Sequence, residues 1–299
     1  MMTNETAWDI SSQDHTIWFA AVVTESIVIF LINTYTLIVF ARNRHLRKCS
    51  TYLIINLTVA DLLVGVVTGP MEIYYDLVTD PGTDFSWKDF SILTFYGIFQ
   101  ISSLTNLSLI SLERLHATLY PIRHFVIGKW VYFGAVICSW LLALLLSSVT
   151  AVLHHYVPIA NGYAWVSCIV LTLMILTISY VIIIANINIK SNPRPRYSGP
   201  VISDRKLSIT LFIVTVVSML TIMPWAIYAV IPIGIWNRLS KTTQFHLAYV
   251  FLVVYYASSL VNPLIYALRL EEFKKAVKEL ICKTASASSH VQPIELHAM

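Results

Sequence analysis

Seven long apolar segments limit most strongly what this chain can fold into. Each has about the 20 apolar residues that an α-helix needs to cross the roughly 30 Å hydrocarbon core of a bilayer. Only 12% of the residues are charged, whereas a soluble domain carries about 25%. The sequence therefore predicts an all-α membrane protein, a seven-transmembrane helix bundle. The expected spans are residues 17–41, 51–75, 89–117, 129–153, 163–189, 206–233 and 245–268.

The basic residues predict how this bundle is oriented. Short loops on the cytoplasmic side of a membrane carry an excess of Lys and Arg. With the N-terminus outside, 17 of the 20 basic residues lie on the inner side, and only Lys88, Arg238 and Lys241 lie outside. We therefore expect a multi-pass protein of the plasma membrane. Its expected parts are an extracellular N-terminus (1–16), the seven-transmembrane domain (17–268), an amphipathic eighth helix (269–282) and a cytoplasmic tail (283–299).

Two positions have the pattern of covalent modification sites. Asn4 begins Asn-Glu-Thr, an N-glycosylation acceptor on the expected outer side. Cys282 follows the basic stretch after the seventh span, where a cysteine is either palmitoylated or a plain free thiol. Of the four cysteines only Cys168 lies near the outer side, so we expect no extracellular disulfide.

Polar residues inside the spans are costly in a bilayer and usually mark function. Asp61 lies midway along the second span, and an ionised carboxylate there needs a partner or a cation. The alternative is an aspartate that the bundle merely tolerates. Neighbouring spans offer hydroxyl and amide oxygens, which suit a small cation or a water cluster. These are Ser103, Ser258, Ser259 and Asn262, while Asn33 and Asn106 either extend the set or form ordinary interhelical hydrogen bonds.

The seventh span contains Asn262-Pro263 and closes with Tyr266. A proline inside a membrane helix frees a backbone carbonyl and kinks the helix. The amide side chain of Asn262 is one residue away, so we expect it to help satisfy that carbonyl. A kinked and polar segment of this kind indicates a part that moves.

A charged pair closes the third span at its cytoplasmic boundary. Glu113-Arg114 there is either an arginine that snorkels to the interface or half of a clasp. Asp204 begins the sixth span on the same side, and we expect it to pair with Arg114 and hold that helix inward. Pro224 supplies a kink about which the helix can swing. A hinge, a clasp and a fixed polar core together predict a two-state element.

These residues together resemble the rhodopsin-like (class A) family of G-protein-coupled receptors over roughly residues 20–282. No single match is specific, but their order along the chain is. The matching positions are Asn33, Asp61, Glu113-Arg114-Leu115 for the Asp/Glu-Arg-Tyr motif, Pro121-Ile122, Trp140, Tyr180, Pro224, Asn262-Pro263-x-x-Tyr266, and Phe273-Lys274 at the start of an eighth helix.

The resemblance implies a mechanism and a set of roles. An outside ligand favours the state in which helix six moves outward, and the exposed cleft then catalyses nucleotide exchange on a heterotrimeric G protein. In the family, the counterparts of Arg114, Pro121 and Ile122 contact the G protein. A sodium ion that favours the inactive state is held by the counterparts of Asp61, Ser103, Ser258, Ser259 and Asn262, and no other cofactor is expected. The implied activation switch is Glu113, Arg114, Asp204, Tyr180, Pro224, Pro263 and Tyr266.

Several features of the family are missing from this chain. The cysteine at the outer end of the third span is absent, with Asp89 at about its place, and the outer loop 154–162 has no cysteine. The proline of the fifth span is missing, Thr172 being the nearest equivalent. Ser218 stands where the transmission phenylalanine is expected, and Ile222 where the toggle tryptophan is expected. The relay from ligand to kink therefore departs from that of the family.

By family position, an aromatic cage with one carboxylate lines the ligand pocket, which suits a cation. The seventh span has no lysine, which argues against an opsin, and Tyr96 replaces the amine-binding aspartate, which argues against a monoamine receptor. The sequence does not identify the ligand. The pocket residues are Glu72, Tyr96, Gln100, Trp165, Trp225, Tyr228, Tyr255 and Tyr256, with an interfacial aromatic belt as the alternative for Trp165 and core packing for Tyr228.

The alternative from another class is a seven-helix transporter or channel. Transporters usually contain paired broken helices in two repeated halves, and the sequence has no such repeat. An enzyme is not expected, because the chain shows no nucleophile–base pair, phosphate-binding loop or metal-ligand spacing. Nucleic acid is not an expected partner either, since the net charge of +4 comes from the inner face.

Overall fold

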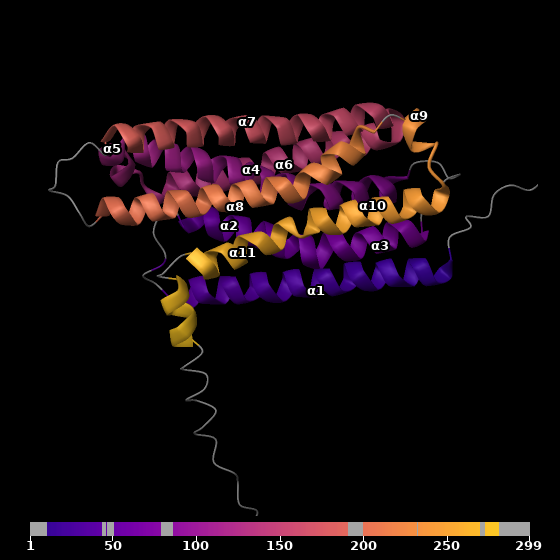
Figure 1. The fold of residues 1–299 in the computed structure, drawn as a ribbon, viewed down its shortest axis with the longest axis horizontal. Helices are drawn as coiled ribbons and strands as arrows, with labels where there is room; N and C mark the ends of the chain where they lie inside the picture. The colour runs from indigo at the N-terminus through magenta and orange to yellow at the C-terminus, as the bar shows by residue number, and fades with distance from the viewer. Residues whose placement is uncertain are drawn as a thin grey trace, which may run out of the picture.

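The chain folds into a bundle of long helices that run nearly side by side in the computed structural model (Figure 1). The structure describes residues 11–43, 46, 51–78, 86–190, 200–231, 233–269 and 273–280. Within these, it does not describe the side chains of residues 76, 78, 187–190, 200–208, 210, 211, 214, 215, 233, 266, 268 and 269.

Seven rods make up the bundle, and the expected seven-helix fold is confirmed. Six helices are long and apolar enough to cross a membrane, and α8 adds the shorter apolar stretch Val216–Ala229. The rods are α1 (Ser12–Arg42), α2–η2–α3 (Thr51–Leu63, Val64–Thr68 and Gly69–Val78), α4 (Trp87–Leu119), α6 (Lys129–Tyr156), α7 (Pro158–Lys190), α8 (Pro200–Ala229) and α10–α11 (Lys241–Tyr256 and Ser258–Arg269). Short helices α5 (Pro121–Val126), α9 (Ile233–Trp236) and 273–280 lie at the rod ends.

The two ends of the bundle are distinguished by these short helices. Helix α5 and the helix 273–280 lie at one end, which we call the α5 end, and α9 lies at the other, which we call the α9 end (Figure 1). The helix 273–280 was expected over 269–282; its Phe273 packs on Phe40 of α1 with ring centroids 5.4 Å apart. Phe273 and Ala276 are buried, so this short helix is fixed to the bundle.

Several helices begin earlier than the apolar pattern predicts, because polar caps extend them. The third expected span starts at Asp89, but α4 begins at Trp87 after a capping box. There the Ser86 hydroxyl accepts from the Asp89 backbone N–H, and the Asp89 carboxylate accepts from the Ser86 backbone N–H. Similarly, Ser11 caps α1 by accepting from the N–H of Gln13. Hydropathy alone does not register such polar starts.

Helix α8 is shorter than predicted at the α9 end. The expected span ran to residue 233, whereas the helix ends at Ala229 and a turn follows. The Ala229 carbonyl lies against Gly162 of α7, where an added Cβ would be only 2.2 Å from the carbonyl oxygen. Glycine therefore lets α7 and α8 approach closely at this end.

The second rod contains one π turn, η2, over Val64–Thr68. Its Gly65 packs so closely on α1 that a Cβ there would meet the Ser26 carbonyl oxygen at 2.8 Å. The π turn separates the part of the rod that carries Asp61 from the part that carries Glu72.

The seventh rod is interrupted at Ala257 rather than at its proline. Pro263 lies inside α11, and it has no N–H to offer the Ser259 carbonyl one turn earlier. Asn33 of α1 donates to that carbonyl from Nδ2 at 3.2 Å. The expectation that Asn262 would serve this carbonyl was therefore wrong, because the Asn262 amide donates to Asp61 instead.

Candidate functional site

Asp61 is the centre of a buried polar network that joins three rods. Its carboxylate is fully buried. Oδ1 accepts from Ser103 of α4 at 3.0 Å and from Ser259 of α11 at 3.1 Å. Oδ2 accepts from Nδ2 of Asn262 at 2.6 Å. The structure thus brings four of the residues singled out from sequence into direct contact.

Helix α8 is tied to this network through a residue that the sequence marked only as a departure from the family. The Ser218 hydroxyl donates to Oδ1 of Asn262 at 3.4 Å. Both side chains are buried. Ser218 therefore connects α8 to the Asp61 network by a long hydrogen bond rather than by an aromatic contact.

A small cavity lies beside the Asp61 network. It has a volume of about 10 Å³, enough for one water molecule. Gln100, Ser103, Ile222, Tyr256, Ser258 and Ser259 are among its lining residues. Ser258 thus faces this cavity, while Ser259 contacts Asp61 directly. The surrounding carboxylate, hydroxyl and amide oxygens are the ligands that a hard cation takes, so the residues present fit a sodium ion.

Asn33 and Asn106 occupy separate positions around this centre. Asn33 reaches the Ser259 carbonyl rather than Asp61. Asn106 accepts from Nδ2 of Asn56 at 2.7 Å, and Asn56 in turn accepts from Nε1 of Trp140 at 2.9 Å. This chain joins α2, α4 and α6, which explains why a tryptophan suits position 140 of α6.

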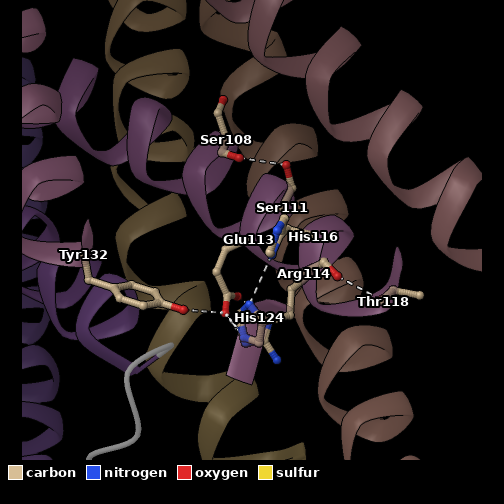
Figure 2. Close-up of polar contacts among 8 residues, drawn as sticks. All are labelled: Ser108, Ser111, Glu113, Arg114, His116, Thr118, His124 and Tyr132. Atoms are coloured by element: carbon tan, nitrogen blue, oxygen red, sulfur yellow. Dashed lines mark hydrogen bonds and ion pairs between the residues drawn. The ribbon is translucent and has the colours of Figure 1, made fainter. Parts of the chain in front are cut away.

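The second polar group lies at the α5 end of α4. Arg114 is buried, and its guanidinium donates through Nε and Nη2 to the two carboxylate oxygens of the adjacent Glu113. Figure 2 shows that Tyr132 of α6 and His124 of α5 point at the same carboxylate. Glu113 Oε1 lies 3.4 Å from the Tyr132 hydroxyl and 3.2 Å from Nε2 of His124.

The expected clasp between Arg114 and Asp204 is not tested by this geometry. The side chains of Asp204 and Tyr266 lie outside the described part of the chain. Pro224 lies inside α8 as expected. Tyr180 is buried, with its ring 4.9 Å from that of Phe212 in α8.

Two groups form among the predicted pocket residues. The first is Glu72 with Tyr96 and Tyr256, and the second is Trp225 with Tyr255 and Tyr228. Glu72 lies close enough to Tyr96 and Tyr256 for its charge to act on them. Trp225 stacks on Tyr255 with centroids 5.7 Å apart and lies 5.1 Å from the ring of Tyr228. Trp165 does not join them, because it packs on Ile101 and Ala143 in a separate apolar cluster. It is neither part of the cage nor an exposed belt residue.

Buried polar atoms gather at the centre of the first group. Within the described part of the chain, the Tyr96 and Tyr256 hydroxyls and the Gln100 amide are buried close to one another, and none of them makes a hydrogen bond of full geometry. Such atoms are costly to bury, so their clustering favours a site that receives polar atoms from a ligand or from water.

The residues expected to meet a partner at the α5 end are accessible. Ile122 of α5 is 83% exposed, and Phe125 on the same helix is 91% exposed. Pro121 opens α5 at its first position and is exposed. The modification sites Asn4 and Cys282 lie outside the described residues. Cys138 and Cys168 are free thiols.

Two polar residues were missed in the sequence: His124 at the Glu113 carboxylate and Glu25, a buried acid of α1. Glu25 lies inside α1, and its Oε2 is buried without a hydrogen-bond partner in the described part of the chain; a carboxylate within an apolar span was the available signal. His124 was missed because nothing in a loop sequence specifies which way a short helix will turn its side chains.

Comparisons with known proteins agree with this architecture. A family model described as the seven-transmembrane receptor (rhodopsin family) matches residues 32–266. Neuropeptide FF receptor 1 of Rattus norvegicus is 31% identical over 163 residues, which are 50% of this chain and 37% of that receptor. Melanocortin receptor 4 of Danio rerio is 22% identical over 276 residues, 87% of this chain and 82% of that receptor.

Neuropeptide FF receptor 2 of Mus musculus is 26% identical over 140 residues, 46% of this chain and 33% of that receptor. The chain thus spans little more than a third of the neuropeptide FF receptors that it matches, but most of the melanocortin receptor. The family match covers the rods that hold Asp61, Arg114 and Pro263. From its fold, its buried polar network and this match, the chain belongs to the rhodopsin family of seven-transmembrane receptors.

Proposed function

We propose that this chain is a plasma-membrane receptor that couples an extracellular ligand to a heterotrimeric G protein. Its α9 end faces outside and its α5 end faces the cytoplasm, an orientation that the excess of basic residues in the inner loops supports. One observation carries the proposal: Asp61 holds α4 and α11 at once, and Asn262 extends the network to α8. A switch needs such a shared element, because a shift at one rod must be felt by the others.

The chain's own residues suggest how the switch works. In this structure Glu113 holds Arg114, so the guanidinium is not available to a partner at the α5 end. The 3.4 Å contact of Ser218 with Asn262 is the weakest described bond of the Asp61 network. Breaking it frees α8 to swing about Pro224 while Asp61 stays bound to α4 and α11. Arg114, Pro121 and Ile122 then contact the G protein.

Sodium is the proposed allosteric ion of this receptor. Asp61, Ser103, Ser258, Ser259 and Asn262 would hold it, next to the water-sized cavity. A bound sodium ion would supply the positive charge that a fully buried carboxylate needs. It would thereby favour the arrangement in which Asn262 of the Asp61 network also accepts from Ser218 and holds α8.

The proposed ligand carries a positive charge. Glu72 supplies the carboxylate, and Trp225, Tyr255 and Tyr256 supply aromatic faces and a hydroxyl. The present cavity holds about one water, whereas a ligand pocket occupies about 300 Å³ or more. Binding therefore requires the rods to separate at the α9 end, which would transmit the ligand's presence to α8.

A reconstituted exchange assay tests the proposal. The receptor in nanodiscs is mixed with each G-protein subtype, and nucleotide exchange is measured without ligand in sodium and in potassium at equal ionic strength. We expect at least one subtype to show exchange that sodium lowers. Asp61→Asn should remove this sodium response, because the amide keeps the shape and loses the charge.

Two results would contradict the proposal at different points. Equal sodium responses in the native receptor and in Asp61→Asn would show that Asp61 does not hold the sodium ion. Absence of nucleotide exchange with every G-protein subtype, both without ligand and with cationic candidate ligands, would refute the proposed coupling. Asp204→Ala is a further test, with raised ligand-independent exchange as the expected result if Asp204 closes the clasp on Arg114.

A further inference from the structure

Glu113 binds more than its arginine. Its Oε1 receives Nη2 of Arg114, the hydroxyl of Tyr132 at 3.4 Å and Nε2 of His124 at 3.2 Å (Figure 2). The Glu113 and His124 side chains are 9% and 21% exposed, so water screens this group only in part. One carboxylate oxygen is thus shared by donors from α4, α5 and α6.

His124 also contacts a second histidine. Its Nδ1 lies 3.4 Å from Nδ1 of His116, which is on α4. One of these two nitrogens must carry the hydrogen and the other must accept it. With neutral His124, the Nε2–H tautomer donates to Glu113 while Nδ1 accepts from His116, and every contact is satisfied.

We propose that His124 is a positioning residue for Arg114, and that a proton on His124 weakens the hold of Glu113 on the arginine. The inference rests on the proposed G-protein coupling for its functional readout. Histidine is suited to this role because its charge changes between about pH 5 and 8.

Charge balance gives the direction of the effect. With neutral His124, the negative Glu113 and the positive Arg114 cancel in a largely buried site. A proton on His124 adds a second cation that attracts the same Oε1 and repels the guanidinium. The excess positive charge is relieved when Arg114 leaves for the space where a partner would bind. Acidification should therefore favour the form of the receptor that is ready for the G protein.

Within the described residues, charged and titratable groups near His124 come from α4, α5 and α6. Helix α4 contributes Glu113, Arg114 and His116, and α6 contributes Tyr132. On α5 itself, Arg123 lies over the ring of Tyr120, 5.8 Å from its centroid. Apart from Glu113, the groups named here that bear a charge are cations. Glu113 is the acid within this described group, and Arg114 already balances its charge.

The test measures ligand-independent nucleotide exchange between pH 6 and pH 8 on the full-length receptor in nanodiscs. We expect exchange to rise about fivefold from pH 8 to pH 6, a factor near the upper end for partly exposed ion pairs. His124→Gln should give a flat profile, because its amide N–H replaces the Nε2 donor without titrating. His124→Asn, which places its amide nearer the Nδ1 position, serves as a second non-titrating variant if the first is poorly folded.

Tyr132→Phe is the matched control. It removes another donor to the same Glu113 oxygen but no group that titrates in this pH range. Its exchange level should change while its rise toward pH 6 remains. A flat profile in Tyr132→Phe, or an unchanged rise in both His124 variants, would overturn the proposal.

A second readout does not depend on the G protein. Spin labels at Ile209→Cys of α8 and Lys274→Cys of the helix 273–280, in a background without the native cysteines, report how far α8 lies from that helix. We expect longer distances to gain population at pH 6 in the native background and not in His124→Gln. A shift in distance with no exchange at any pH would refute the proposed coupling and leave His124 supported. Exchange with sodium sensitivity but without any His124-dependent shift would refute the His124 proposal alone.

Discussion

The contact between Asn33 and the Ser259 carbonyl allows a quantitative test of how the seventh rod is held. Pro263 cannot supply the N–H that this carbonyl would receive in an uninterrupted helix, and Nδ2 of Asn33 donates to it at 3.2 Å. The perturbation is Asn33→Leu, which keeps the volume and removes the donor. In the Pro263→Ala background an N–H is restored at position 263, so the same substitution should matter less.

The structure sets the size of the effect. Asn33 also donates to the Ile29 carbonyl at 3.0 Å, but that carbonyl keeps its own helical donor. The loss is therefore one buried carbonyl without a partner, about 1–3 kcal/mol in general and about 0.6–1.7 kcal/mol from measurements in membranes. Leucine also removes Oδ1 of Asn33, a buried acceptor without a partner in the described residues. We expect a net loss of about 1 kcal/mol, a lowering of the melting temperature by about 3 °C.

The assay is a double-mutant cycle on the detergent-solubilised receptor, with tryptophan fluorescence followed against temperature. The four proteins are the native chain, Asn33→Leu, Pro263→Ala and the double variant. The expected coupling is about 1 kcal/mol, because Asn33→Leu should cost almost nothing once alanine occupies position 263. Thr36→Val is the matched control: its hydroxyl donates only to Ile32 of its own helix, and its loss should stay within about 0.5 kcal/mol.

Additive effects in this cycle would refute the reasoning. They would mean that a donor other than Asn33 satisfies the Ser259 carbonyl, or that Asn33 acts through contacts that have nothing to do with the proline. A loss of stability in Thr36→Val as large as that in Asn33→Leu would show instead that removing any polar group from this face of α1 is equally harmful.

Three further outcomes follow from contacts described above. Gly162→Ala should lower the melting temperature by several degrees, because its Cβ would lie 2.2 Å from the Ala229 carbonyl oxygen; Gly134→Ala, with nothing within 4 Å, should raise it slightly, and equal behaviour would contradict the close approach. Trp140→Phe should lower the free energy of unfolding by about 0.6 kcal/mol through the lost hydrogen bond to Asn56. An unchanged melting curve would show that this hydrogen bond does not contribute to stability. Ile122→Ala should slow nucleotide exchange without changing the melting temperature, because Ile122 is 83% exposed; unchanged exchange would remove it from the coupling surface.

The spans and the central polar residues were predictable from the sequence for physical reasons. Hydrocarbon thickness fixes the length of a spanning helix, and a lone carboxylate such as Asp61 must find partners wherever the bundle places it. The helix ends were less accessible, because caps such as Ser86 with Asp89 are polar. Trp165 was assigned to the cage by position along its helix, whereas its packing depends on how α4, α6 and α7 meet.

The partner of each polar group was harder to predict than its presence. Asn262 was expected to serve the Ser259 carbonyl that Pro263 leaves free, but an acid across the bundle binds it at 2.6 Å. A charged acceptor offers a stronger hydrogen bond than a backbone carbonyl, and only the assembled bundle shows that one is within reach. His124 illustrates the same limit, because its contacts with Glu113 and His116 exist only once α5 has packed against α4.

The π turn at Val64–Thr68 has a consequence for reading this protein against its relatives. A π turn holds one residue more than an α-helical turn, so every residue beyond it is rotated by about 100° relative to an uninterrupted helix. Eleven residues separate Glu72 from Asp61, which in an uninterrupted helix would put both on nearly one face. In the structure both are directed toward α4, where Asp61 contacts Ser103 and Glu72 lies near Tyr96. An alignment of this chain with a relative that places no gap across the turn therefore assumes that the relative has the same extra residue. Deleting one residue within 64–68 would change which way the only carboxylate of the cage points while leaving the composition of the helix almost unchanged.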